Sequence, residues 1–172
     1  MESYVRQARP ADLEKIAEIF DSGRIFLKNQ GLPQWQDGHG PTGPLAEADM
    51  ERGHGYVLVY QGEVAGYTAL VPAPDGSPPL TEGQWIEGYG QHVVIHRVAL
   101  AGSLRGRGLS RQFLRDMVLT ARIWGYRDIR IDTHPGNQIM RKIIEQTGFS
   151  YRGLMHLPIP NGERLAYQMI LD

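Results

Sequence analysis

The feature that most constrains this chain is a glycine- and arginine-rich turn between an apolar segment and an amphipathic one. Residues 98–110 read Val-Ala-Leu-Ala-Gly-Ser-Leu-Arg-Gly-Arg-Gly-Leu-Ser. The nearly continuous apolar run in 91–100 predicts a buried strand, and the apolar spacing in 109–124 predicts a helix. A strand that passes through such a turn directly into a helix presents unpaired backbone N–H groups and the positive end of the helix dipole. The segment therefore predicts a phosphate site.

Four residues of the turn suit a phosphate ligand. Gly106 and Gly108 let the backbone approach an anion closely and adopt positive φ angles, and Arg105 and Arg107 add positive charge. The spacing matches neither the Gly-x-x-x-x-Gly-Lys-Ser/Thr sequence of a P-loop nor the Gly-x-Gly-x-x-Gly sequence of a dinucleotide-binding turn. The alternative interpretation is an ordinary helix entry with solvated arginines.

The other patterns along the chain predict an α/β (α+β) domain with a mixed sheet. Two segments rich in proline and glycine, 32–44 and 72–90, are predicted loops. Trp124 lies on the apolar face of its helix and is assigned to the core. The 172 residues carry no obvious linker, so we expect one domain over residues 1–172. The predicted strands are 4–9, 56–60, 63–71, 91–100, 127–133, 149–154 and 164–171, and the predicted helices are 13–20, 22–29, 45–52, 109–124 and 137–147.

The composition argues against several classes of function. Lys and Arg number 18 against 19 Asp and Glu, a formal charge of −1, which is unusual for a general nucleic-acid binder. There is no cysteine, and the six histidines form no helical pair with metal-binding spacing, so we expect no disulfide and no metal site. No stretch approaches the ~20 apolar residues of a membrane span. Since residues 1–10 also lack an apolar signal-peptide core, we expect a cytoplasmic protein without membrane partners.

The sequence Arg105-Gly106-Arg107-Gly108-Leu109-Ser110 resembles the Arg/Gln-x-x-Gly-x-Gly/Ala motif of the GCN5-related N-acetyltransferases, the GNAT superfamily. The final small position is Ser110, a mild departure. The element order around the motif, including Asn137 before a helix and the Thr147-Gly148-Phe149 sequence after it, is similar to that of the family over most of the chain. The resemblance implies a central mixed, twisted sheet of about six to seven strands flanked by helices, with a splayed strand pair that holds acetyl-CoA.

The resemblance also implies which residues bind this cofactor. The backbone amides of the motif would hold the pyrophosphate of acetyl-CoA. The strand before the motif would bind the pantetheine arm, and Asn137 would contact the pantetheine end, although an N-cap role for Asn137 is an alternative. The implied cofactor-binding residues are Val98, Ala99, Leu100, Arg105, Gly106, Arg107, Gly108, Leu109, Ser110 and Asn137.

Two catalytic residues that are common in the family are missing here. The usual tyrosine seven residues after the helix-entry asparagine is Ile144, and the glutamate eleven residues before the motif is Val94. We therefore predict His96 as the general base, because strand alternation gives it the parity of Val94, Val98 and Leu100. An imidazole with its ordinary pKa near 6.5 accepts a proton at neutral pH. The alternative for His96 is a hydrogen-bonded core residue.

For the general acid, the candidates are His134 and Tyr151. Asp132 and His134 lie at the carboxyl end of a predicted strand, where α/β sheets place their ligands. His134 is equally consistent with a cap on the turn that follows that strand.

The acceptor is expected to bind residues 26–41 and 84–91, as the resemblance implies. Among these, Trp35, Asp37, Trp85 and Glu87 offer the aromatic and acidic groups that suit a cationic amine. The predicted function is acetyl-CoA-dependent transfer of an acetyl group directly to a primary amine of a small molecule or peptide. Three alternatives stay open: a non-catalytic acyl-CoA sensor, a protein N-terminal acetyltransferase of the ribosomal-protein type, and an unrelated phosphate-binding domain. A homodimer is also left open.

Overall fold

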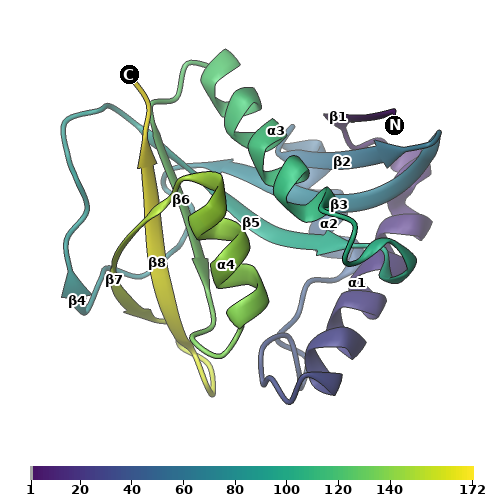
Figure 1. Cartoon of the computed structure of the whole chain (residues 1–172), viewed down its shortest axis with the longest axis horizontal. Helices are drawn as coiled ribbons and strands as arrows, with labels where there is room; N and C mark the ends of the chain where they lie inside the picture. The colour runs from purple at the N-terminus through teal and green to yellow at the C-terminus, as the bar shows by residue number, and fades with distance from the viewer. Residues whose placement is uncertain (1) are drawn as a thin grey trace.

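The computed structural model describes residues 2–172, which form one mixed sheet with helices on both faces (Figure 1). The strand order is β1-β2-β3-β5-β6-β8-β7-β4, and only β5 and β6 run parallel. The mixed α/β fold is confirmed, with eight strands rather than six to seven. The additional strand is β4, whose two residues pair with β7 from within the predicted loop 72–90. The strands are β1 (Ser3–Gln7), β2 (Gly55–Tyr60), β3 (Glu63–Pro72), β4 (Glu82–Gly83), β5 (His92–Leu100), β6 (Asp128–Thr133), β7 (Ser150–His156) and β8 (Glu163–Ile170).

Four α-helices in the described residues cover the sheet: α1 (Leu13–Asn29), α2 (Gly43–Glu51), α3 (Leu109–Ile123) and α4 (Gln138–Thr147). Apolar residues of α3 and α4 form the larger core cluster with one face of the sheet, and those of α1 and α2 form a second cluster on the other face. The two helices predicted at 13–20 and 22–29 are one continuous helix. Gly23 lies inside this helix, and a glycine suits the position because a Cβ there would come within 2.9 Å of the Trp35 ring. None of these helices is long and apolar enough to cross a bilayer.

Strands β5 and β6 pair over only part of their length. Their register runs from His92 opposite Asp128 to Ile95 opposite Ile131. Beyond that point β5 continues to Leu100 while still paired with β3 on its other edge. Figure 1 shows the two strands diverging. The β6-facing edge of β5 therefore carries backbone groups that no strand pairs with, and an opening forms in the middle of the sheet.

A bulge at Arg97 reverses the alternation of β5. The β3–β5 register steps from Ala69 opposite His96 to Tyr67 opposite Ala99, which adds one residue to β5, and Arg97 takes a positive φ of 58°. Val98 therefore packs with the cluster under α3 and α4, whereas His96 pairs with Asp75. The prediction that His96 shares a face with Val98 and Leu100 is wrong, because one inserted residue moves every later side chain to the opposite face.

Buried charges hold the bulge in place. The Arg97 guanidinium donates two hydrogen bonds to the Asp49 carboxylate of α2, at 2.7 and 3.1 Å. The Tyr67 hydroxyl donates to the same carboxylate at 2.6 Å, and burial, together with Asp49, raises the pKa of Tyr67. Opposite the bulge, the Thr68 hydroxyl donates to the His96 carbonyl at 2.9 Å. These contacts stabilise the unusual backbone of Arg97 and so fix where His96 points.

The core assignment of Trp124 is wrong. Its side chain lies at the end of α3 and the residue is 63% exposed. The indole N–H donates to the Tyr56 hydroxyl at 3.0 Å. The predicted apolar face of the helix runs too far toward its end. The helix ends at Ile123, and both Ile123 and Trp124 are exposed to solvent.

Replacing Asp49 by alanine should destabilise the protein by about 2–3 kcal/mol, because it leaves the partly buried Arg97 guanidinium and the Tyr67 hydroxyl without an acceptor. Urea unfolding measures this. The exposed Glu47 of the same helix provides the matched control, and Glu47→Ala should change stability by no more than about 0.5 kcal/mol. Equal stability of the two variants would contradict the assignment of Asp49 as the anchor of the bulge.

Candidate active site

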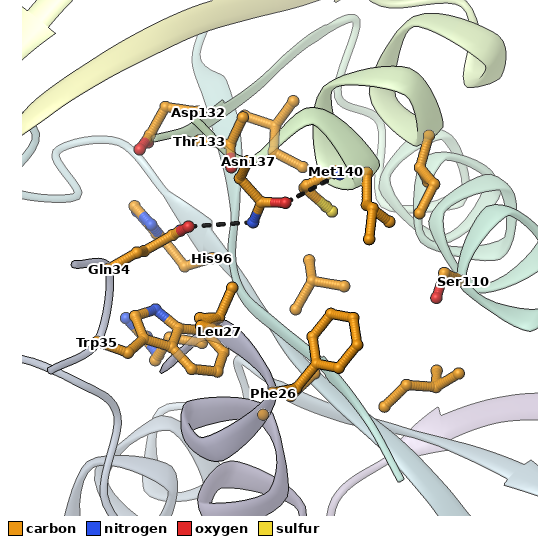
Figure 2. Close-up of a pocket in the computed structure, with 18 of the residues that line it drawn as sticks. Phe26, Leu27, Gln34, Trp35, His96, Ser110, Asp132, Thr133, Asn137 and Met140 are labelled. Atoms are coloured by element: carbon orange, nitrogen blue, oxygen red, sulfur yellow. Dashed lines mark hydrogen bonds between the residues drawn. The ribbon is translucent and has the colours of Figure 1, made fainter. Parts of the chain in front are cut away.

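A cavity of about 850 Å³ occupies the opening between β5 and β6 (Figure 2). Residues from both faces of the sheet line it, because the opening passes between the strands. One end lies at the turn before α3, and the other lies between the loop after α1 and the turn that joins β7 to β8. The cavity thus connects the predicted phosphate site with the first of the two predicted acceptor segments, residues 26–41.

The phosphate end of the cavity is formed by the glycine-rich turn. Gly106 and Gly108 have φ angles of 80° and 77°, and Gly108 is the N-cap of α3. No atom lies within 4 Å of a Cβ placed on either glycine, so the backbone conformation, not crowding, requires glycine here. The first N–H groups of α3 have no carbonyl four residues earlier within the helix. The turn therefore offers an anion several backbone donors at the positive end of a helix.

Arg105 braces this turn. Its guanidinium donates to the Leu100 carbonyl at 3.2 Å and to the Ser22 hydroxyl at 3.3 Å, and it lies 4.4 Å from the centre of the Phe26 ring. Desolvation lowers the pKa of Arg105, but the guanidinium is still positively charged at neutral pH. Arg105, Gly106, Gly108 and Ser110 line the cavity, whereas Arg107 is exposed and Leu109 is buried in the core, outside the lining.

The middle of the cavity presents groups that an amide-bearing chain would satisfy. The open edge of β5 at Val98, Ala99 and Leu100 forms one side. On the other side, the buried Thr133 hydroxyl has no hydrogen-bond partner within residues 2–172. An unpartnered buried hydroxyl beside an unpaired strand edge is costly unless a ligand bonds to it. These residues therefore fit the pantetheine arm of coenzyme A.

Asn137 lies in the same part of the cavity and uses both ends of its amide (Figure 2). Its carbonyl oxygen accepts from the Met140 N–H at 3.1 Å, so it caps α4. Its amide nitrogen donates to the Gln34 side chain at 3.0 Å, which ties α4 to the loop after α1. The cap geometry is present, and the side chain also lines the cavity where the resemblance implied a pantetheine contact.

A partly buried carboxylate–imidazole pair lies where β5 and β6 separate. The His96 Nε2 atom and the Asp75 carboxylate are 2.7 Å apart, and the Ser77 hydroxyl also donates to Asp75. Burial by itself would raise the pKa of Asp75, but the hydrogen bonds from His96 and Ser77 outweigh it and lower the pKa to about 2. Asp75 is therefore ionised at neutral pH. Sequence reasoning missed it, because its Pro-Asp-Gly-Ser context signals only a turn.

Asp132 of β6 and Arg164 of β8 also line the cavity. Burial raises the pKa of Asp132, while the nearby charges of His96 and Arg164 act in the opposite direction. Asp132 lies at the carboxyl end of β6, where the sequence analysis expected ligand-binding residues. Arg164 carries no signal in the sequence, because it begins a strand after an Asn-Gly turn and looks like an ordinary solvated arginine.

The predicted acceptor residues are only partly brought together. Trp35 lines the cavity and packs edge-on against Phe20, with ring centres 6.5 Å apart. Asp37 is exposed and lies outside the lining. Trp85 instead lines a second cavity of about 440 Å³, where it stacks on Arg130 at 4.2 Å, and Glu87 lies 3.9 Å from the same guanidinium.

The two candidates for the general acid lie outside the cavity lining. The His134 Nδ1 atom accepts from the Gly136 N–H at 3.0 Å, so it caps the turn after β6, and burial lowers the pKa of His134. Tyr151 is half-exposed and packs edge-on against Tyr167. Ile144, at the position of the common tyrosine, is fully buried in the larger core cluster.

Comparison with known proteins identifies the class. Residues 18–149 match the acetyltransferase (GNAT) family, so the chain belongs to that family. Its members use acetyl-CoA as the acetyl donor. The chain is 24% identical over 156 residues to the uncharacterized N-acetyltransferase YesJ of Bacillus subtilis strain 168, covering 87% of this chain and 83% of that protein.

Solved structures agree with this assignment. A GNAT-family acetyltransferase from Streptococcus agalactiae 2603 superimposes with a TM-score of 0.87 at 28% identity, covering 99% of this chain and 96% of that one. The structure of yncA from Salmonella typhimurium with its cofactor acetyl-CoA has a TM-score of 0.66 at 21% identity, with 99% and 94% coverage, and so shares the fold.

Replacing Gly108 by proline should weaken coenzyme A binding at least tenfold, because it removes a backbone donor and demands a φ near −65° where the turn has 77°. Isothermal calorimetry on the folded variant measures this. Gly125→Pro is the matched control, since it also removes an N–H and a positive φ, of 90°, but at the far end of α3. Unchanged affinity in Gly108→Pro would show that the phosphates bind elsewhere.

Proposed function

We propose that this protein is an acetyl-CoA-dependent N-acetyltransferase that moves an acetyl group directly to a primary amine, with His96 as the general base. The observation that carries the proposal is the hydrogen bond between Asp75 and His96, because His96 lines the cavity at the point where β5 and β6 separate while Asp75 lies behind it, in the lining of the second cavity. Residues 1–172 would form a single domain with this activity. The family assignment supplies the donor, and the chain's own residues supply the proton chemistry.

Different residues around the cavity would bind different parts of acetyl-CoA. The amides of residues 106–110 would bind the pyrophosphate, with Arg105 bracing the turn. The edge of β5 at residues 98–100 and the Thr133 hydroxyl would bind the pantetheine amides, beside Asn137. When bound, acetyl-CoA supplies an acetyl group already activated as a thioester, so the protein needs no covalent nucleophile.

The hydrogen bond to Asp75 sets the tautomer of His96. Because Asp75 is ionised at neutral pH, it only accepts, and the His96 Nε2 atom must carry the proton. The Nδ1 atom of the neutral ring is then left with a free lone pair that can take a proton from the amine, directly or through water. The Asp75 charge also stabilises the imidazolium that forms. General-base assistance of this kind contributes about 10²–10⁴-fold.

Backbone groups would stabilise the negative charge that develops during the transfer. N–H groups on the open edge of β5 near Val98 can donate to the acetyl oxygen as negative charge develops on it, an effect of about 3 kcal/mol per donor. His134 and Tyr151 do not enter the proposal, because neither lines the cavity. Trp35 would form an aromatic wall on the acceptor side.

Thiol release from acetyl-CoA over a panel of primary amines, combined with thermal shift by coenzyme A, tests the proposal. Turnover with at least one amine is expected, together with stabilisation by coenzyme A. Stabilisation without turnover on any amine would contradict an enzyme and support an acyl-CoA sensor. An absence of both effects would contradict the proposed use of acetyl-CoA.

The pH dependence of kcat/KM should report His96. In the wild type the rate should fall as the pH is lowered, because a protonated imidazole cannot accept a proton. Asp75 does not cause this fall, since its pKa of about 2 keeps it ionised throughout. His96→Gln should lose the acidic limb and about 100-fold in kcat/KM at pH 8, with unchanged affinity for coenzyme A.

Asp75→Asn serves as the companion variant. It keeps the size of the side chain but removes the charge that orients the ring, so it should lower kcat while leaving the KM for acetyl-CoA unchanged. An unaltered pH profile at an unaltered rate in His96→Gln would remove His96 from the mechanism.

A further inference from the structure

Arg164 is a buried cation without an ionic partner. The residue is only 6% exposed, yet it lines the cavity. Its Nη1 atom donates to the backbone carbonyls of Asn161 and Glu163, at 2.9 and 2.8 Å. Among residues 2–172, no carboxylate lies within 4 Å of its guanidinium, and no protein oxygen accepts from its Nε or Nη2 atoms. Desolvation lowers the pKa of Arg164, while the nearby charge of Asp132 acts in the opposite direction without forming an ion pair.

The other arginines near the site differ in this respect. Arg97 lines the same cavity but makes two hydrogen bonds to Asp49. Arg130, equally buried, makes two hydrogen bonds to Asp128, at 2.8 and 3.1 Å. A buried charge is costly unless an opposite charge pairs with it. Arg105 also lines the cavity without a carboxylate partner, but it braces the turn at the phosphate end. Of the two arginines that are buried among residues 2–172, Arg130 is paired, and Arg164 is the one whose anionic partner must come from a ligand.

A carboxylate lies beside it. Asp132 of β6 is opposite Ala166 of β8, so Asp132 and Arg164 are diagonal neighbours on one face of the sheet. Both line the cavity, and no direct ion pair joins them. The charges of His96 and Asp75 also influence the pKa of Asp132, in opposite directions. One wall of the cavity therefore presents a negative group near the proposed base and a positive group further along β8.

We infer that the acceptor is a free amino acid, whose carboxylate binds Arg164 and whose amine lies at Asp132 and His96. This inference rests on the proposed function and names its substrate class. The unused Nε and Nη2 atoms form the fork with which arginine binds a carboxylate through two parallel hydrogen bonds. Asp132 attracts the ammonium form, and His96 takes the proton that the amine must lose before its nitrogen attacks.

The same geometry weighs against the other amine classes. A polyamine or an aminoglycoside has no carboxylate for Arg164. The N-terminus of a protein carries its amine far from its own chain-terminal carboxylate, so it would leave Arg164 buried and unpaired. The cavity is also lined by Trp35 and by Leu157 and Ile159 of the β7–β8 turn, which would accommodate the side chain of a free amino acid.

The test compares each amino acid with its own methyl ester and with the amine that lacks the carboxyl group. The wild type should acetylate the acid with a kcat/KM about 30-fold or more above that of its ester, as expected when a buried charge loses its partner. Acid and ester reacting equally would overturn the inference and leave the N-acetyltransferase proposal intact.

Two variants of the arginine sharpen the result. Arg164→Gln should bring the ratio of acid to ester rates close to one, and Arg164→Lys should restore part of the preference. Because the ratio is measured within one variant, a loss of folded protein does not change it. Arg130→Gln removes an arginine that is already paired, and it should keep the wild-type ratio. A wild-type ratio in Arg164→Gln would overturn the inference.

Binding separates this inference from the proposed chemistry. With coenzyme A present, amino acids should raise the melting temperature of the wild type more than their esters do. If no amine is acetylated but amino acids bind selectively through Arg164, the proposed catalysis fails and the binding site stands. If amino acids stabilise the protein no more than their esters and show no rate advantage, the carboxylate site is wrong.

Discussion

The parting of β5 from β6 after Ile95 and Ile131 is the constraint on which the rest of the site depends. A mixed sheet with a single parallel pair can open there without losing its other pairings, because β3 still holds β5 and β8 still holds β6. The opening leaves strand-edge amides, the Thr133 hydroxyl and the turn before α3 around one cavity. Cofactor binding is thus built mainly from backbone, which explains why few side chains are needed for it.

Because of the bulge at Arg97, His96 and Val98 lie on opposite faces of the sheet at this opening. Without the extra residue, Val98 would share a face with His96 and turn away from the core beneath α3 and α4. With it, His96 reaches Asp75 while Val98 stays in the core. The Asp49–Arg97 and Asp75–His96 pairs are partly buried charges with a partner, whereas Arg164 has no ion pair. The first pair stabilises the bulge, the second is the proposed base, and Arg164 is left to bind a ligand.

The sequence revealed the parts of the protein that depend on local rules. The turn at 105–110, the amphipathic α3 and the order of most elements along the chain followed from glycine placement and apolar periodicity. The bulge did not, because nothing local distinguishes Arg97 from a regular strand residue and its anchor, Asp49, lies 48 positions away. Asp75 and Arg164 were missed for a similar reason, since their roles arise from tertiary placement. Trp124 was misassigned because helical periodicity does not show where a helix leaves the sheet.

A crystal structure with coenzyme A and an amino acid would test the account most directly. The account predicts the pyrophosphate on the amides of residues 106–110, the amino-acid carboxylate on Arg164, and the acceptor nitrogen facing the Nδ1 atom of His96. Phosphates bound away from the turn before α3, or an acceptor nitrogen remote from His96, would contradict it.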